Sequence, residues 1–209
     1  MKIIELFAGS CSFGDIAKSR GHQVWTTDNG KDLFTQDQYD KINLLENVLF
    51  LDHDSFPFKP DVIWASPPCT YFSISSIGKH WNSDNTPKST EADLGVRFVK
   101  KTFEIINFLS PKYYFIENPL GKLRKLDFMK SYNRITVTYC QYGDGRMKPT
   151  DIWTNSKWQG RPMCNYGDNC HESAPRGSRF GTQGLDTPFE RSRVPADLCN
   201  EILEFVEND

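Results

Sequence analysis

The sequence predicts an α/β fold in which a mostly parallel sheet is flanked by helices. Short apolar runs alternate with stretches of helical periodicity through about three quarters of the chain. Strands separated by helices imply right-handed crossovers and a parallel sheet that is covered on both faces. With 209 residues, of which 38% are hydrophobic, the chain can bury one sizeable core.

The first half of the chain predicts four strands with one clear helix among them. Residues 2–7 are a compact apolar run, and the small residues that follow turn into a helix over 12–20. The next clear apolar runs, at 22–27 and 61–65, are the second and fourth strands. The third strand lies within 41–51, where the pattern leaves its boundaries open.

The second half predicts a long helix and three more strands. Apolar residues recur at near-helical spacing through 90–109, where Thr90 and Asp93 resemble a capping pair, and Pro111 ends the helix. The remaining strands are expected at 113–116, 134–140 and 151–154.

The composition changes after the last strand. Residues 156–190 are rich in Gly, Pro, Asn, Arg and Ser with little periodicity, which is typical of an irregular segment. Pro195 then opens a final helix with an apolar face. We therefore expect one main domain made of residues 1–155 and 191–209, interrupted by a small irregular insert at 156–190.

Composition and charge exclude several classes of protein. No apolar run approaches the ~20 residues of a membrane span, and the short, acidic N-terminal run is unlike a signal peptide. Six scattered cysteines suit reduced thiols, so we expect a cytoplasmic protein. The net charge is −2, so binding of nucleic acid would need a local basic patch.

Two strand ends predict a nucleoside-bearing cofactor. Ligands of open parallel sheets bind beyond the carboxyl ends of the strands. The turn at 7–14 brings backbone amides to a helix N-terminus, but it lacks the full dinucleotide glycine pattern and the phosphate-loop lysine. Asp28 ends the second strand, where a carboxylate can accept hydrogen bonds from a ribose. A plain tight turn and a turn aspartate are the alternatives.

Two further strand ends carry reactive groups. The Pro-Pro-Cys motif at 67–69 follows the fourth strand, and its prolines restrict the direction in which Cys69 points. A thiol becomes a useful nucleophile when a nearby cation favours its thiolate. Glu117 ends the next strand, where partial desolvation favours a carboxyl that can donate a proton. A structural thiol and an ordinary strand exit are the alternatives.

Taken in order, these motifs resemble those of the DNA (cytosine-5) methyltransferases. The cofactor loop of that family resembles residues 4–9, its catalytic Pro-Cys the motif at 67–69, and its Glu-Asn-Val the Glu-Asn-Pro at 117–119. The segment at 142–148 resembles the family's Gln-x-Arg-x-Arg. Ser-Pro-Pro-Cys-Thr and the Ile-Trp-Thr-Asn at 152–155 resemble the short phage-encoded branch.

The resemblance implies a Rossmann-like, S-adenosylmethionine-dependent methyltransferase fold and the family's covalent chemistry. Cys69 would add to carbon-6 of a cytosine flipped out of double-stranded DNA, so that carbon-5 can accept a methyl group. Glu117 would hold ring nitrogen N3, and Arg146 and Lys148 would supply positive charge near the base. The polar segment at 73–89 would act as a lid, or would be a merely solvated loop.

The same resemblance implies the cofactor contacts. The residues expected around S-adenosylmethionine are Phe7, Gly9, Asp28 and Pro68. Counting back from the catalytic cysteine leaves two open candidates for the adenine contact, Asn47 and Asp52.

The chain departs from the family pattern in three places. Cys11-Ser12 stand where the family prefers glycines. The later motif becomes Arg146-x-Lys148-x-Thr150, and lysine cannot reproduce the planar fork of arginine. The insert is far shorter than a usual target-recognition domain. Residues 144–193 hold eight Lys and Arg against six Asp and Glu, about +2, which predicts modest non-specific affinity and a short or lax recognition sequence.

Cys164, Cys170 and His171 suggest zinc within the insert. Only three ligands are close in sequence and their spacing is not that of a standard finger, so we expect unligated thiols and no metal.

Other functions stay open. An RNA or tRNA cytosine-5 methyltransferase would keep the chemistry, and a catalytically idle DNA-binding protein would keep the scaffold. Retention of Cys69 with Glu117 argues against the idle protein. An oxidoreductase fits poorly, because the glycine fingerprint is incomplete. We expect a monomer that acts on double-stranded DNA and not on membranes. Protection of a phage genome from restriction is a hypothesis from the resemblance alone.

Overall fold

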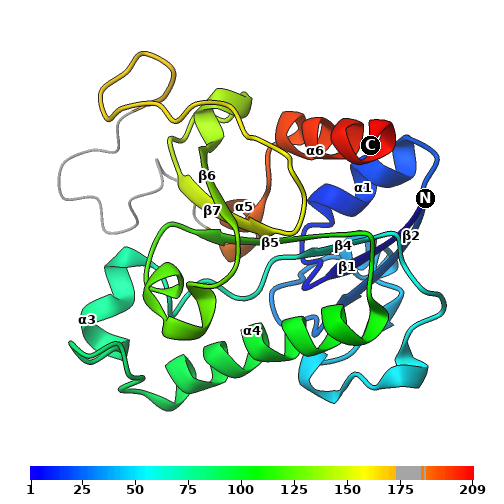
Figure 1. Cartoon of the computed structure of the whole chain (residues 1–209), viewed down its shortest axis with the longest axis horizontal. Helices are drawn as coiled ribbons and strands as arrows, with labels where there is room; N and C mark the ends of the chain where they lie inside the picture. Colours follow the sequence, from blue (N-terminus) through cyan, green and yellow to red (C-terminus); the bar gives the residue numbers. More distant parts are fainter. Residues whose placement is uncertain (173–184, 186) are drawn as a thin grey trace.

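A single sheet organises the chain. The computed structural model describes residues 1–172, 185 and 187–209, and within them seven strands run in the order β3-β2-β1-β4-β5-β7-β6 (Figure 1). The strands are β1 Lys2–Leu6, β2 Gln23–Asp28, β3 Leu44–Leu45, β4 Val62–Ala65, β5 Tyr113–Pro119, β6 Arg134–Thr138 and β7 Pro149–Thr154. Each predicted strand is present, and the α/β fold class is confirmed.

The sheet is parallel except at β7. Strands β1 to β5 pair in parallel, whereas β7 is antiparallel to both β5 and β6. A parallel return needs a crossover of a dozen or more residues, usually a helix. Only residues 139–148 join β6 to β7, so the chain turns back antiparallel. The sequence pattern did not predict this reversal.

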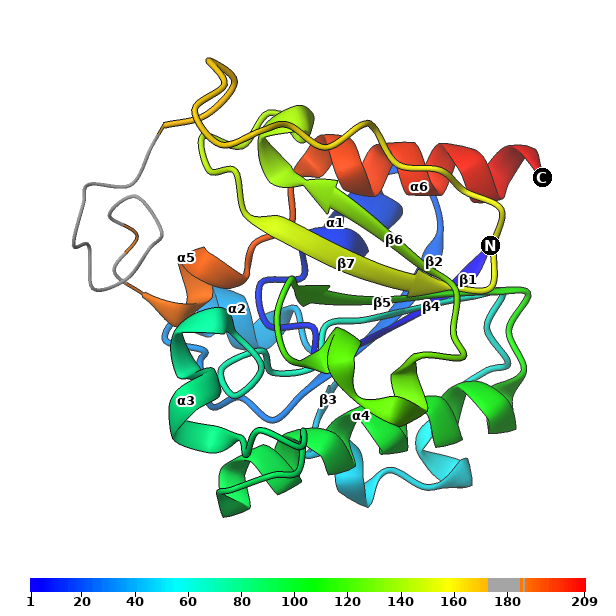
Figure 2. The same cartoon turned by 60° about the vertical axis from the view of Figure 1, so that its left-hand side comes forward.

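Helices cover both faces of the sheet (Figures 1 and 2). The α helices are α1 Ser12–Ser19, α2 Gln36–Asp40, α3 Ile77–His80, α4 Thr90–Leu109, α5 Pro188–Ser192 and α6 Ala196–Asn208. The long α4 packs its apolar residues on one face, and α1 and α6 pack together on the other. None of the helices in the described ranges is long and apolar enough to cross a bilayer.

Short 3-10 turns connect several of these elements. They are η1 Val48–Phe50, η2 His53–Ser55, η3 Ile74–Ser76, η4 Leu123–Lys125, η5 Asp127–Met129 and η6 Tyr139–Tyr142. The last of them, η6, directly follows β6 and matters for the site below.

The long helix α4 matches its predicted range, but its cap differs. The hydroxyl of Ser89 accepts a hydrogen bond from the backbone N–H of Ala92 at 3.1 Å, so Ser89 is the N-cap and the predicted Thr90–Asp93 capping pair was wrong. The helix ends at Ser110, which adopts a left-handed conformation before Pro111.

The segment at 73–89 is anchored rather than merely solvated. It contains η3 and α3, and the indole of Trp81 is buried and donates to the carbonyl of Tyr71 at 2.7 Å. The alternative of a simple solvated loop is therefore wrong. The lid remains a prediction.

The start of the insert docks on the main domain. Residues 156–172 contain no helix or strand, yet Trp158 and Cys164 are buried, and the Trp158 ring packs edge-on against Phe115. At the other end, α5 begins inside the range assigned to the insert. Residues 173–184 and 186 of the insert lie outside the described residues.

Candidate active site

Cys69 and Glu117 lie at the same edge of the sheet, where Cys69 follows β4 and Glu117 stands within β5 opposite Ile152 of β7. Strands β4 and β5 pair in parallel, and their last pair is Ala65 opposite Ile116. Beyond this last pair come Glu117 on β5 and the Pro-Pro-Cys turn after β4. The side-chain amide of Asn118 donates to the carbonyl of Pro67 at 2.9 Å and ties the two strand exits together. The sheet therefore brings the two predicted catalytic groups into one neighbourhood.

Burial and two charged side chains, Lys148 and Glu117, affect the pKa of Cys69. Burial raises the pKa of the Cys69 thiol, Lys148 opposes that rise, and Glu117 adds to it. The charges of both side chains therefore act on the sulfur. Because the pKa is raised, the thiol is mostly protonated at neutral pH, and the positive charge of Lys148 favours the thiolate.

Lys148 is the cation that faces this pair. Its ammonium lies 4.5 Å from the ring centroid of Tyr139 and donates to the carbonyl of Arg191 in α5 at 3.0 Å. Burial lowers the pKa of Lys148, whereas Glu117 and Cys69 raise it. The three charged or chargeable groups thus form one coupled set.

Arg146 does not share this position. Its buried guanidinium forms an ion pair with Asp144, with Nε 2.8 Å from Oδ1, and Nη1 donates to the carbonyl of Arg191 at 3.5 Å. The expected contact between Arg146 and the base has no support in this geometry. Through its hydrogen bonds to Asp144 and to the carbonyl of Arg191, Arg146 instead links the loop before β7 to α5.

Tyr139 holds Glu117 from the opposite side. Both residues are buried, and the phenol donates to Oε1 of Glu117 at 2.8 Å. Tyr139 begins η6, directly after β6. No sequence signal identified it, because the pattern does not tell which residue beyond a strand will turn back toward a carboxylate two strands away.

A small cavity opens beside the loop that follows β1. Its lining comes from that loop, from β4 and from the segment before α6: Glu5, Phe7, Ala8, Gly9, Ser10, Ser12, Trp64, Ser66, Ser192 and Val194. Phe7 and Gly9 both adopt left-handed conformations, which bend the chain sharply at the end of the strand. Two predicted cofactor residues therefore line the cavity.

Asp28 lies against the same loop. One oxygen of its carboxylate accepts from the backbone N–H of Gly9 at 3.0 Å, and the other accepts from Gly30 at 2.8 Å. Burial raises the pKa of Asp28, and these two hydrogen bonds oppose that rise. A carboxylate oxygen has more than one acceptor site, so a ribose hydroxyl can still be bound.

The remaining predicted cofactor residues lie outside the cavity lining within the described part of the chain. Asn47 lies two residues after β3 and caps η1, where its side-chain oxygen accepts from the N–H of Leu49. Asp52 is exposed and caps η2 through the N–H groups of Asp54 and Ser55. Pro68 is half-buried beside Cys69. The capping explains Asp52 without any cofactor.

Comparison with known proteins identifies the family of this chain. A family model described as C-5 cytosine-specific DNA methylase matches residues 1–143. A curated protein of Frog virus 3 (isolate Goorha), named "Probable DNA (cytosine-5)-methyltransferase", is 32% identical over 228 residues that cover 98% of this chain and 99% of that protein. The chain belongs to the C-5 cytosine-specific DNA methylase family. The resemblance inferred from the motifs is confirmed.

Solved structures share the fold of this family member. A DNA modification methyltransferase encoded within an E. coli prophage aligns with a TM-score of 0.52 at 15% identity, covering 74% of this chain and 46% of its own. The S. pombe Dnmt2 methyltransferase aligns with a TM-score of 0.51 at 12% identity, covering 78% and 51%. This methylase thus spans about half the length of these two structures.

Glu5 is a buried group that the motif reading did not single out. In this methylase its Oε2 accepts from the backbone N–H of Gly14 at 2.9 Å, at the start of α1. Burial raises the pKa of Glu5 to about 8. A Cβ on Gly14 would lie 2.4 Å from that oxygen, so only glycine leaves room for the carboxyl. An acidic residue within an otherwise apolar strand was the available signal.

Proposed function

We propose that this chain transfers a methyl group from S-adenosylmethionine to carbon-5 of a flipped cytosine in double-stranded DNA, through a covalent adduct at Cys69. The observation that carries the proposal is that β4 and β5 bring Cys69 and Glu117 to one edge of the sheet, where Asn118 binds the carbonyl of Pro67 and the charge of Lys148 acts on both groups. Family membership supports the reaction class, and the electrostatic coupling supports these three residues as its machinery.

The cavity beside β1, about 60 Å³, can hold only part of a nucleoside cofactor, and its lining suits a group without phosphates. No Lys or Arg side chain occurs among its described lining residues, whereas phosphate sites usually carry one. Asp28 offers acceptors for a ribose. When bound, S-adenosylmethionine supplies an electrophilic methyl group. Both adenine candidates cap a 3-10 turn, and Asn47 is the better of the two because it is partly buried near the end of β3, whereas Asp52 is exposed.

The side chains divide the remaining work. The Cys69 thiolate forms a bond to carbon-6, which moves an electron pair toward carbon-5 and makes it nucleophilic. Glu117 supplies a hydrogen bond and a proton to N3 as charge develops there, and Tyr139 orients its carboxyl. Lys148 stabilises the thiolate. After methylation, water takes the proton from carbon-5, the ring double bond re-forms as the carbon-6–sulfur bond breaks, the electron pair leaves with the sulfur, and N3 returns its proton to Glu117. The described insert would contact the DNA around the base.

A fluorinated substrate tests the proposal. Long duplexes in which 5-fluorocytosine replaces cytosine throughout present every sequence context. Carbon-5 of this base carries fluorine in place of the hydrogen that must be removed as a proton, so the covalent complex cannot be resolved. We expect a covalent complex on denaturing gels that requires S-adenosylmethionine and is absent for Cys69→Ala. The same assay is repeated with tRNA that contains 5-fluorocytosine. Adducts on tRNA alone would favour the RNA enzyme, and no adduct on either would favour an idle binding protein. Bisulfite sequencing of host DNA after expression then reads the sequence context.

A further inference from the structure

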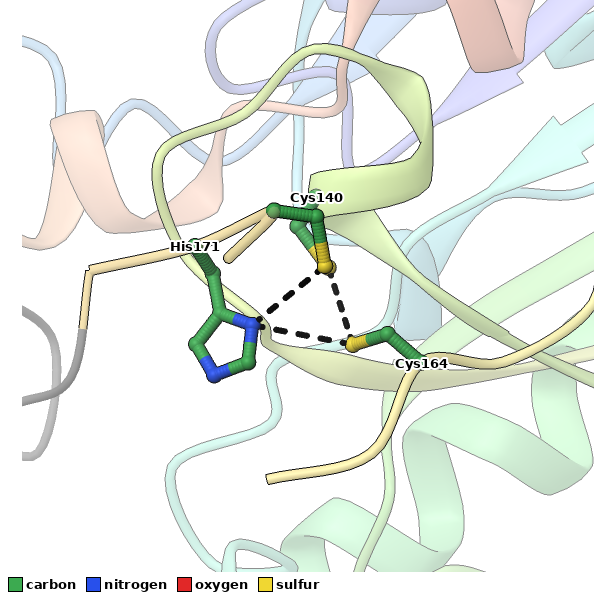
Figure 3. Close-up of side chains that lie close together, drawn as sticks. Cys140, Cys164 and His171 are labelled. Atoms are coloured by element: carbon green, nitrogen blue, oxygen red, sulfur yellow. Dashed lines mark hydrogen bonds between the residues drawn. The ribbon is translucent and has the colours of Figure 1, made fainter. Parts of the chain in front are cut away.

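Three cysteine sulfurs and one imidazole meet at the end of β6 (Figure 3). The ligand atoms of Cys140, Cys164, Cys170 and His171 all lie within 4.8 Å of one another. Cys140 belongs to η6, and the other three come from the described start of the insert. In Figure 3 the labelled side chains of Cys140, Cys164 and His171 point toward a common centre.

Three of the distances between these atoms match those of a tetrahedral zinc site. With bonds of ~2.3 Å to sulfur and ~2.0 Å to nitrogen, neighbouring ligand atoms are about 3.5–3.8 Å apart. The Sγ atoms of Cys140 and Cys170 are 3.6 Å apart, and Nδ1 of His171 is 3.5 Å from Sγ of Cys170 and 3.7 Å from Sγ of Cys164. The sulfurs of Cys140 and Cys164 are closer, at 3.1 Å, yet far beyond the ~2.05 Å of a disulfide.

We propose that Cys140, Cys164, Cys170 and His171 bind one structural Zn²⁺. Three thiolates with one imidazole form a soft donor set that favours zinc over magnesium or calcium. Four protein ligands fill a tetrahedral shell and leave no open position, so the ion has a structural rather than a catalytic role. This site is separate from the coupled set at Cys69 and does not rest on the proposed function.

The surroundings support ligands rather than idle thiols. The side-chain amide of Gln141 donates to Sγ of Cys170 at 3.5 Å, and the backbone N–H of Cys164 donates to the hydroxyl of Thr138 at 3.1 Å. Outer contacts of this kind orient metal ligands. The two partners, Thr138 and Gln141, belong to β6 and η6. The main domain therefore supplies hydrogen bonds that hold ligands of the insert in place.

A bound metal would also stabilise the insert, which has little core of its own. Between the buried Cys164 and His171 the chain has no regular secondary structure, and Tyr166 is 80% exposed. A segment with so little core of its own gains its order from a bound metal. The expectation of unligated thiols counted only three local ligands. Cys140, 24 residues before Cys164, supplies the fourth and removes that objection.

The consequence is a link between the insert and the turn that holds Glu117. Cys140 follows Tyr139, whose phenol donates to the Glu117 carboxyl. A metal bound at Cys140 therefore restrains η6 and, through it, the orientation of Tyr139. Loss of the metal is expected to loosen both the insert and this contact.

Metal analysis of the purified full chain tests the proposal. We expect one Zn²⁺ per chain by mass spectrometric elemental analysis, and replacement by Co²⁺ is expected to give the thiolate charge-transfer and tetrahedral d–d bands. Cys164→Ser should lose the metal. The matched control is Cys69→Ser, which removes a thiol outside the cluster and should retain one Zn²⁺ while failing to form the DNA adduct.

A second variant keeps all four ligands. Gln141→Leu removes the hydrogen bond to Cys170 and should weaken zinc binding by about 10–100-fold in a chelator competition. The proposal is overturned if the wild-type chain holds no zinc after purification and after zinc is added back, or if thiol mapping finds a Cys140–Cys164 disulfide. Either result leaves the adduct assay intact, so it would not be confused with failure of the methyltransferase.

Discussion

The chain holds two kinds of cysteine site, and they differ in what surrounds the sulfur. Cys69 stands alone after rigid prolines, with the charge of Lys148 acting on it. Cys140 lies among other thiols, and burial followed by hydrogen bonding to Cys164 raises its pKa to about 12. A lone thiol beside a cation can act as a nucleophile, whereas crowded thiols become thiolates when a metal replaces their protons. The two proposals therefore give the same residue type opposite roles at one edge of the sheet.

Exchanging single thiols tests this comparison most strongly. Cys69→Ser should lower methyl transfer by more than about 10³-fold, because the hydroxyl is a far weaker nucleophile at carbon-6. Methyl transfer is measured with labelled S-adenosylmethionine. If Cys69→Ser retains activity while Cys164→Ser abolishes adduct formation in a folded protein, the two sites have been assigned the wrong way round.

Glu117→Gln is expected to have the next largest effect. The amide keeps the size of the side chain but cannot deliver a proton to N3, so the rate should fall by about 10²–10³-fold. Tyr139→Phe, which leaves the carboxyl in place and removes only its hydrogen bond, should cost less. Single-turnover rates distinguish the two variants. Equal losses would indicate that Tyr139 does more than orient the acid.

Lys148→Met separates the two cysteine sites by pH. Lys148 lowers the pKa of Cys69, so its removal should raise that pKa and move the alkylation profile of Cys69 to higher pH. At a fixed pH near 8 we expect alkylation to slow by about tenfold, since less thiolate is present. Peptide mapping after iodoacetamide treatment measures each thiol. The zinc content should not change, and an unchanged Cys69 profile would argue against the cation role.

The smallest effect concerns how the Cys69 turn is packed. A Cβ on Gly121 would lie 2.2 Å from the carbonyl of Phe72, which also accepts from the N–H of Lys122. Gly121→Ala should therefore cost about 1–3 kcal/mol of unfolding free energy and slow adduct formation. Gly78→Ala is the matched control, because no atom lies within 4 Å of its Cβ position. Urea denaturation measures the free energy of unfolding of both variants. Equal stability of the two would show that the turn can shift to accommodate the added methyl group.

Local pattern predicted much of the catalytic half. The apolar runs identified the strands, and the ordered motifs identified Cys69, Glu117 and the loop of Phe7 and Gly9. The pattern could not show which partners these polar side chains have within the chain. Arg146, expected near the base, pairs with Asp144, and Asp52, a candidate for adenine, caps η2, so both roles stay predictions. Sequence alone cannot tell which partner a charged side chain will choose.

What the sequence determined by itself is the order of the elements and the chemistry at strand ends, because strand and helix periodicity and turn residues act over a few positions. Only the tertiary structure decided the antiparallel return of β7, the contact of Tyr139 with Glu117 and the arrival of Cys140 beside Cys164, Cys170 and His171. Each of these depends on contacts between residues far apart in the chain. Such contacts are set by how the whole sheet packs and leave no local periodic signal.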